Sequence, residues 1–324
     1  MIKRVTIILL QLLVTAAGIF YVFHDPQERT RIADALRHSD WKWLVLGWLC
    51  YGMVEALATV RWQILLRIQG IHLNWLRVGA IVMIGLFFNM FLPGLVGGDV
   101  MRLYLVFKDA PRQRNRAALS VAMDRLLGLL SIVSLAAIVV LLRFGWLKRY
   151  PATAHIAYLA LGLLGTAVVL IALLFGAVGF GLLNRLPKRF PSRKTILQSG
   201  KALDLYRTHS RPILFAFVLT IIAHLAYYMT FYCAAQSLHG SINRTPSVSD
   251  ILSIMPLVNT ITGVPISFGG VGVRETLFQQ LLGNLAQVPA ALAAITATLG
   301  FVIQASWGLV GGIAFIVSRR TKRG

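Results

Sequence analysis

Two stretches of this 324-residue chain decide its fold: Asn89-Met-Phe-Leu-Pro-Gly-Leu-Val-Gly-Gly-Asp-Val-Met-Arg102 and Val264-Pro-Ile-Ser-Phe-Gly-Gly-Val-Gly-Val-Arg-Glu275. Each contains the pattern Pro-x3-Gly-Gly-x3-Arg in apolar surroundings, and an internal repeat is weighed before other signals. Proline and paired glycines break helices, and a membrane accommodates a broken helix only where protein or a water-filled cavity satisfies the freed backbone groups. Two such breaks in corresponding halves of a chain are typical of a transporter site.

The composition defines the class of protein. Hydrophobic residues make up 57% of the chain and charged residues 13%, and the mean hydropathy is +0.73. A water-soluble surface cannot be assembled from this composition, so the chain is expected to be an integral membrane protein. The alternation of a β-barrel is missing, which predicts an all-α polytopic helical bundle.

Long uncharged runs mark the membrane segments. These runs are 5–23, 126–142, 150–184, 212–243, 251–273 and 276–318. Several exceed the roughly 20 residues that one crossing needs, so some must hold a span plus a turn or half-span. A helix is also expected from about Trp43 to Trp62, despite Glu55. The first run has no small-x-small cleavage site and is expected to be retained.

Basic residues gather in loops, which sets the predicted topology. The clusters are Arg61/Arg67/Arg77, Arg112/Arg114/Arg116, Arg185/Lys188/Arg189/Arg193/Lys194 and Arg319/Arg320/Lys322/Arg323. Positively charged loops face the cytoplasm, so both termini and the basic loop 184–211 are predicted inside. Arg143, Lys148 and Arg149 fall on the predicted outer side, against this rule.

Alternating the remaining spans leaves two regions that must enter and leave the membrane by one face. Residues 78–117 do so from the cytoplasmic face and residues 250–285 from the outer face. The sequence therefore predicts two re-entrant broken-helix hairpins from opposite faces, as an inverted repeat requires. We predict a single transmembrane domain over 1–324, with repeat one at about 41–142 and repeat two at about 212–317.

The net charge is +21 from 32 basic and 11 acidic residues. Its position in loops favours anionic lipid over nucleic acid, and no nucleic-acid partner is expected. Cys50 and Cys233 lie in apolar helices and are interpreted as packing residues, so neither a disulfide framework nor a zinc site is predicted. No cofactor is expected, and monomer and homo-oligomer both stay open.

The repeated pattern can bind an anion. A half-helix that starts at paired glycines presents free backbone N–H groups and a favourable dipole, and an arginine within about one turn can grip a phosphate or carboxylate. The predicted substrate-binding residues of the two copies are Arg102, Arg274, Gly97, Gly98, Gly269, Gly270, Asn89, Asn259, Asp99 and Glu275. The alternative is that the glycines serve close helix packing and each arginine snorkels or pairs with Asp99 or Glu275.

The two stretches, with Ser120-Val-Ala-Met-Asp-Arg-Leu126, resemble the signatures of the lysylphosphatidylglycerol synthase transmembrane family, a flippase-like family. The resemblance covers about residues 5–317. It implies movement of a polar-headed lipid between leaflets and a home in the bacterial cytoplasmic membrane. No stretch is polar enough for the soluble aminoacyl-transferase domain, so lysine transfer is not expected.

Charged residues at membrane depth are costly and are usually functional. Glu55 either binds a proton or cationic head group or pairs with Arg125 or Arg102. Asp124 and Arg125 are adjacent and point in different directions, so each needs its own partner; Asp124 holding Arg102 and Arg125 joining the anion site are both open. His224 is either a proton relay or a packing residue.

These observations lead to a hypothesis of lipid translocation, with an anionic polar-headed lipid, of phospholipid or polyprenyl-phosphate type, as the partner. No nucleophile elbow, Walker loop or metal motif points to an enzyme. A polyprenyl-phosphate-dependent glycosyltransferase is the alternative, and it would need Asp99, Asp124 or Glu275 as base or metal ligand. A lipid-binding scaffold without transport is the third hypothesis.

Overall fold

The computed structural model describes most of the chain. The described residues are 37–91, 97–179, 205–206, 208–239, 245–264 and 267–320. The predicted first span 5–23, most of the basic loop 184–211 and both prolines of the repeated pattern lie outside them. Helices joined by short connections make up the described part, with no strand among those residues, so the all-α prediction is confirmed.

Long and short helices follow one another in the same order twice. The first set is α3 (Trp41–Ile68), α4 (Trp75–Phe91), α5 (Gly97–Asp109) and α6 (Arg114–Leu147), with the short η1 (Pro111–Gln113) before α6. The second is α9 (Ser210–Gln236), α10 (Val248–Thr262), α11 (Val273–Ala286) and α12 (Ala290–Arg320), with η4 (Phe268–Gly270) before α11. Helix α7 (Pro151–Gly179) lies between the two sets in sequence.

Five helices are long and apolar enough to cross a membrane: Trp41–Ile68, Pro111–Leu147, Pro151–Leu170, Ser210–Gln236 and Ala290–Val317. Their most apolar windows are only 17% to 39% buried inside the protein, so most of this apolar surface is available to lipid. The prediction of a polytopic helical membrane protein is therefore confirmed.

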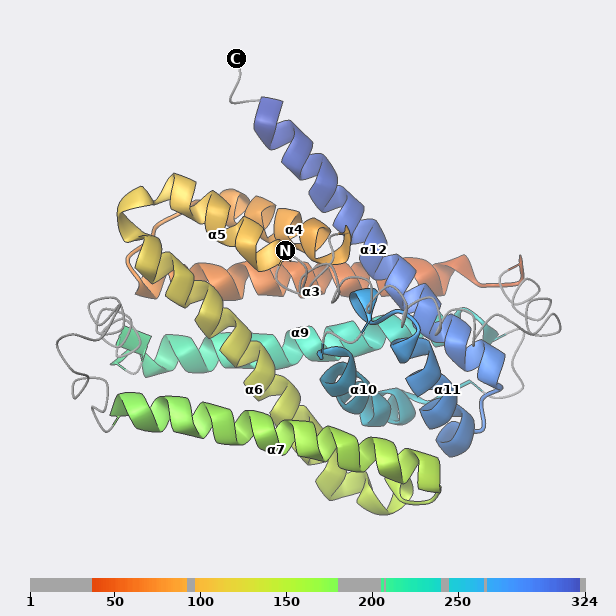
Figure 1. Ribbon diagram of the computed structural model, residues 1–324. Coiled ribbons are helices and arrows are strands. Elements are labelled where there is room, and N and C mark those ends of the chain that lie inside the picture. Colours follow the sequence, from red (N-terminus) through yellow and green to blue (C-terminus); the bar gives the residue numbers. More distant parts are fainter. Residues whose placement is uncertain are drawn as a thin grey trace, which may run out of the picture.

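Helices α4, α5, α10 and α11 have 17, 13, 15 and 14 residues, which is fewer than one crossing needs. Figure 1 shows α4 and α5 as a hairpin that opens toward the C-terminal end of α3, whereas α10 and α11 open toward the opposite end of the bundle. Entry of the two hairpins from opposite membrane faces, and their inverted symmetry, stay predictions.

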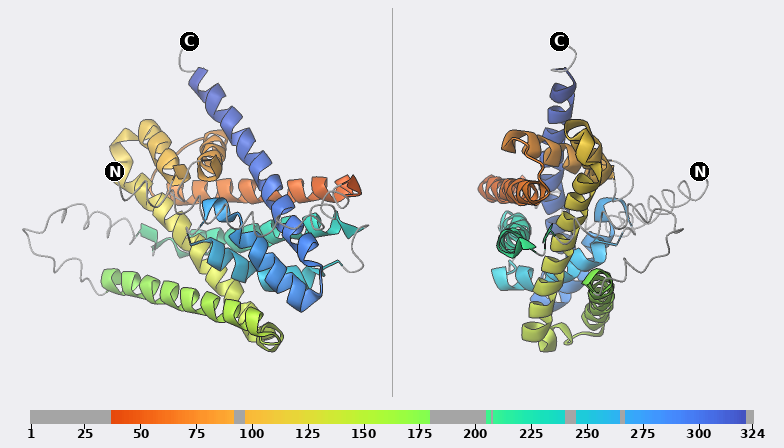
Figure 2. Two further views of the ribbon diagram at one scale, coloured as in Figure 1. Left: turned by 45° about the vertical axis from the view of Figure 1, so that its right-hand side comes forward. Right: turned by 90° about the vertical axis from the view of Figure 1, so that its left-hand side faces the viewer.

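The axes of α3, α7 and α9 are nearly parallel, with α9 running opposite to the other two, and α6 and α12 cross them (Figure 1). The right-hand view of Figure 2 looks nearly along the first three axes. Helix α3 packs along α9, α12 packs on α4 and α11, and α10 contacts α6, α7, α9 and α11. The core divides into one cluster on the α3–α4–α5–α6 side and another on the α9–α10–α11–α12 side. Helix α6 contributes residues to both clusters and so connects them.

Helix α3 is longer than the sequence predicts. It continues past Trp62 to Ile68 because Leu65 and Leu66 are fully buried against the core, and it ends before Gly70, whose φ is +75°. The prediction that Arg61 opens a cytoplasmic loop is wrong: its guanidinium lies inside the bundle, where a carboxylate from α6 binds it.

Close backbone contacts between helices depend on glycines. A methyl group on Gly311 of α12 would overlap the Met83 carbonyl oxygen of α4, and one on Gly98 of α5 would overlap the Gly85 carbonyl oxygen of α4. Helix association in lipid relies on such small residues, since apolar surface gains nothing by leaving apolar lipid. The glycines thus fix α4 against both α5 and α12.

We expect Gly311→Ala to lower the free energy of unfolding by about 1–3 kcal/mol, because the added methyl forces α4 and α12 apart. Gly162→Ala in α7 is the matched control, since its added methyl meets no atom within 4 Å. Melting of each purified variant in detergent, followed by tryptophan fluorescence, measures the difference. Equal melting temperatures for the two variants would contradict the packing argument.

Candidate functional site

The first motif lies beside a buried carboxylate. Asp124 of α6 is 3% exposed, and its Oδ1 accepts a hydrogen bond from Arg61 Nε of α3 at 2.7 Å. Its Oδ2 accepts from Arg102 Nη1 of α5 at 3.0 Å. One carboxylate therefore binds guanidinium groups from two other helices. The sequence left Asp99, Asp124 and Glu55 open as partners of Arg102; the structure shows Asp124 at hydrogen-bond distance and Asp99 within ion-pair distance, at 3.7 Å.

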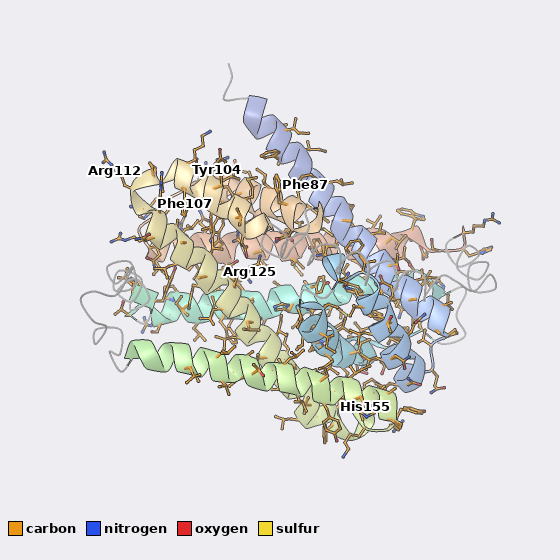
Figure 3. All side chains as sticks on the ribbon, in the orientation of Figure 1. Phe87, Tyr104, Phe107, Arg112, Arg125 and His155 are labelled. Carbon is orange, nitrogen blue, oxygen red and sulfur yellow. The ribbon has the colours of Figure 1, made fainter. Side chains whose placement is uncertain are left out.

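A second ion pair joins α5 and α6, this time with the carboxylate on α5 and the arginine on α6. Arg125 of α6 makes a bidentate contact with Asp99 of α5, at 2.7 Å from Nε and 2.6 Å from Nη2. Figure 3 labels Arg125 on α6, in the middle of the bundle, and Arg112 in η1, at the edge of the bundle. The Arg125 side chain is 53% exposed, so this pair lies nearer the protein surface than the pair between Arg102 and Asp124.

Aromatic and hydroxyl groups complete the surroundings of these charges. The Arg102 guanidinium lies 4.1 Å from the centre of the Trp62 ring, within the range of a cation–π contact. Trp62 Nε1 donates to Ser120 Oγ at 3.3 Å, and Arg61 Nη1 donates to Thr220 Oγ1 at 3.3 Å. We name Arg61, Arg102, Asp99, Asp124 and Arg125 the charged cluster.

Glu55 lies next to the charged cluster. Its carboxylate stands beside the Tyr51 hydroxyl on the same helix and feels the charges of Arg61, Arg102 and Asp124. With Glu55 ionised, three basic and three acidic groups balance in this part of the protein. His224 of α9 stands near the Gly128 backbone and the charge of Arg61, with its ring 6.1 Å from that of Tyr228.

The remaining residues of the first motif shape the turn between α4 and α5. Helix α5 begins at Gly97, and the N–H of Gly98 donates to Asn89 Oδ1 at 2.8 Å. That amide is therefore already satisfied by a side chain, and Gly98 lets α5 approach α4 closely. Gly98 and Asn89 therefore serve helix packing, which was the alternative interpretation of the motif. Binding of a substrate by these two residues stays a prediction.

The second motif has a different local structure. Gly269, Gly270 and Gly272 have φ values of 60°, 78° and 84°, and residues with side chains rarely adopt such backbone conformations. They place the chain so that Gly272 caps α11, where its N–H donates to Glu275 Oε2 at 2.7 Å. Glu275 Oε1 accepts from Thr298 Oγ1 at 3.4 Å, so the carboxylate is bound by α11 and α12.

Arg274 at the start of α11 is a buried cation without a carboxylate partner. It is 6% exposed, and no described acidic group lies within ion-pair distance of it. Its Nη2 donates to the Gly269 carbonyl oxygen at 3.1 Å, and the guanidinium lies 5.7 Å and 5.5 Å from the rings of Phe231 and Phe301. Its Nη1 has no hydrogen-bond partner in the part of the chain that the structure describes.

A line of aromatic contacts connects the two motifs. Tyr51, beside Glu55, has its ring centre 6.1 Å from that of Tyr227, and Tyr227 lies 5.1 Å from Phe231, over which Arg274 sits. The Asn259 side chain of α10 lies beside the Tyr228 hydroxyl of α9. The structure thus brings together Glu55, Asp99, Arg102, Asp124 and Arg125, and places Arg274, Glu275 and Asn259 around the second motif.

Sequence reasoning missed several residues of these surroundings. Arg61 was counted with the loop charges, although its place within an apolar stretch is the signal that could have assigned it to the interior. Trp62, Phe231 and Phe301 carry no such signal, because an aromatic residue in an apolar helix is ordinary.

The fold and the buried charges define a polytopic helical membrane protein that keeps arginines and carboxylates in the interior of its bundle. Residues 8–312 match the family model described as the lysylphosphatidylglycerol synthase TM region. The chain belongs to this family, which confirms the resemblance seen in its motifs and implies a lipid-related function in the membrane. A comparison with curated proteins finds no match.

We expect Asp124→Asn to destabilise the protein by about 3–5 kcal/mol, because Arg61 loses its carboxylate partner and Arg102 keeps only the longer contact with Asp99 at 3.7 Å. Asp109→Asn is the control: its pair with Arg77 at 2.7 Å lies nearer the surface, and the expected loss is about 1 kcal/mol or less. Chemical or thermal unfolding in detergent measures both. Losses of the same size would show that Asp124 does not hold the bundle together.

Proposed function

We propose that this protein moves a lipid with an anionic polar head group between the leaflets of a bacterial cytoplasmic membrane. One observation carries the proposal: Arg274 is a buried cation with a free Nη1 at the start of a helix too short to span the membrane. A buried unpaired charge is costly in a membrane protein, and such residues usually mark substrate pathways. Membership of the family supports a lipid as the substrate.

In this mechanism the head group binds at Arg274 and Arg102 in turn, while the acyl tails stay in the bilayer. A phosphate oxygen accepts from Arg274 Nη1, and the helix N-terminus favours its negative charge. Neutralising the head group lowers the desolvation cost that keeps unassisted lipid movement slow. Rocking of the two repeats against each other exposes the head group to each side, with both termini of the chain in the cytoplasm.

The charged cluster gives Arg102 a resident counter-anion. When the head group reaches Arg102, the Asp124 carboxylate gives up one of its two guanidinium partners and keeps Arg61 at 2.7 Å. Neither Asp124 nor Arg102 is left unpaired during this exchange. Binding of the head group at Arg102 is therefore electrostatically feasible although the arginine is already paired.

The transferase alternative finds less support in the geometry. Asp99, Asp124 and Glu275 were its candidate bases or metal ligands, and all three carboxylates are bound to other groups of the protein. Asp99 holds Arg125, Asp124 holds two arginines, and Glu275 caps α11. A free carboxylate that could take a proton from an acceptor hydroxyl is not among these three.

The test is transbilayer movement in proteoliposomes, measured as protection of fluorescent phosphatidylglycerol from a membrane-impermeant reductant. We expect Arg274→Ala and Arg102→Ala each to slow movement about tenfold or more, because one good charge-assisted contact is worth more than 1.4 kcal/mol. Arg112→Ala removes the same charge from an exposed site and is expected to have no effect.

Unchanged movement in folded Arg102→Ala and Arg274→Ala protein would refute the mechanism. Formation of a glycosylated lipid that requires an added sugar donor would favour the transferase. Co-purified anionic lipid with neither movement nor transfer would favour the scaffold.

A further inference from the structure

One carboxylate near the charged cluster has no basic partner. Glu55 lies near the middle of α3 and is partly buried, and no described arginine, lysine or histidine lies within ion-pair distance of it. The two carboxylates of the charged cluster do have such partners: Asp99 is 2.6 Å from Arg125, and Asp124 is 2.7 Å from Arg61. A carboxylate at membrane depth is costly, and such residues often belong to proton relays.

The face of α3 that carries Glu55 points into the bundle. Tyr51 lies about one turn before Glu55 on this face and Trp62 two turns after it, and they are 3% and 0% exposed. The Trp62 ring centre lies 4.1 Å from the Arg102 guanidinium. The Glu55 carboxylate has the Tyr51 hydroxyl as a hydrogen-bonding neighbour and lies within electrostatic range of the charged cluster. Glu55 therefore acts on the charged cluster without forming an ion pair in it.

The helices around α3 bring few other titratable groups to this place. Arg77 of α4 is already paired with Asp109 at 2.7 Å. The groups that face Glu55 and its neighbours are, by helix, Tyr51 and Arg61 on α3, Arg102 on α5, Asp124 on α6, His224 and Tyr227 on α9, and Gln304 on α12. Of these, His224 is the second candidate for a proton, so an experiment must distinguish it from Glu55.

The charges of this place balance before a head group arrives. The three arginines of the charged cluster are matched by its two carboxylates and Glu55. An anionic head group at Arg102 keeps every ion pair satisfied by exchange, but it adds a negative charge that nothing matches. A proton on Glu55 restores the balance at least cost, because a proton on Asp99 or Asp124 would break an ion pair.

Both protonation states of Glu55 find hydrogen-bond partners. The Tyr51 hydroxyl lies beside the Glu55 carboxylate and the Gln304 side chain, and it can donate to the ionised carboxylate. When Glu55 is neutral, its O–H can donate to the Tyr51 oxygen. The Tyr51 hydroxyl then turns to the Gln304 amide, whose Oε1 is buried and has no partner in the described part of the chain.

We infer that Glu55 is a proton-binding site and that a proton travels with each anionic head group. This inference rests on the proposed function, because the head group must reach Arg102. A hydronium ion transfers its proton to a Glu55 carboxylate oxygen and leaves as water, so one O–H bond forms and one breaks. When the head group departs, the carboxyl O–H breaks and the proton returns to water. Lipid and proton together carry no net charge, so a pH difference drives the movement and a membrane potential does not.

The experiment counts protons during lipid binding. Phosphatidylglycerol in detergent is added to the purified full chain in weakly buffered solution, and an indicator dye follows the pH, at starting values from about pH 5 to about pH 8. We expect the wild type to take up about one proton per bound lipid at the pH of strongest uptake. The lipid-bound protein holds the extra proton, so its affinity rises as the pH falls, by up to about tenfold per pH unit.

Three variants locate the proton. Glu55→Asp keeps a carboxyl group and is expected to keep the uptake. Glu55→Gln has no titratable group, so it is expected to take up no proton and to bind phosphatidylglycerol with an affinity that does not change with pH. The control is Asp109→Asn, which removes a carboxylate paired with Arg77 outside the charged cluster and is expected to behave as the wild type does.

Lipid movement in proteoliposomes gives a second readout that a merely structural role of Glu55 would not move. We expect the wild type to respond to an imposed pH difference and to ignore a potassium diffusion potential set by an ionophore. Glu55→Gln moves the anion without a proton, so it is expected to respond to the potential and to ignore the pH difference.

Binding of phosphatidylglycerol by the wild type without proton uptake would overturn this inference and leave the proposed function standing. This result needs no variant, so it decides the question even where Glu55→Gln does not fold. Uptake that persists in Glu55→Gln and is lost in His224→Gln would assign the proton to His224 and overturn the role of Glu55. Neither binding nor movement of lipid by the folded wild type would refute the proposed function itself.

Discussion

The structure depends on how charges inside a membrane bundle find partners. Asp124 lies between Arg61 of α3 and Arg102 of α5, and it thereby fastens three helices at one buried point. A lone charge there would cost several kcal/mol, but hydrogen bonds to both carboxylate oxygens offset this cost. Glycine contacts bring the helices of the first hairpin together. The ion pairs fix which faces of α5 and α6 meet, because each helix supplies one carboxylate and one arginine to the other.

The two copies of the repeated pattern have become unequal. In the first, the arginine is neutralised by a carboxylate of a neighbouring helix, and Asn89 has taken the amide at the start of the short helix. In the second, three glycines with positive φ hold an open turn, and Arg274 meets a carbonyl oxygen and two aromatic rings in place of a carboxylate. The two arginines are therefore not equivalent: Arg102 has carboxylate partners, whereas Arg274 has none among the described residues.

The sequence predicts the helices well because hydrophobicity and loop charge are summed over many residues, so single exceptions matter little. It fails at Arg61 for the same reason: an arginine near a helix end counts as a loop charge unless its partner Asp124, which lies 63 positions away, is known. The pairing of Arg102 with Asp124 and of Arg125 with Asp99 depends on where α6 crosses α5, which spacing along the chain does not give. That Arg274 Nη1 lacks a partner among the described residues is visible only once the packing is known.

Unequal halves suit a transporter better than equal ones. Two arginines without carboxylate partners would hold an anionic head group between them and resist its release, since no new contact within the protein would offset the contacts that are lost. Because Asp124 is the counter-anion of Arg102, a head group that leaves Arg102 lets this ion pair form again. Binding and release at Arg102 are then close to an exchange of partners. In the proposed mechanism, Arg274 then supplies the net attraction, because its Nη1, which has no partner among the described residues, gains one when a head group binds.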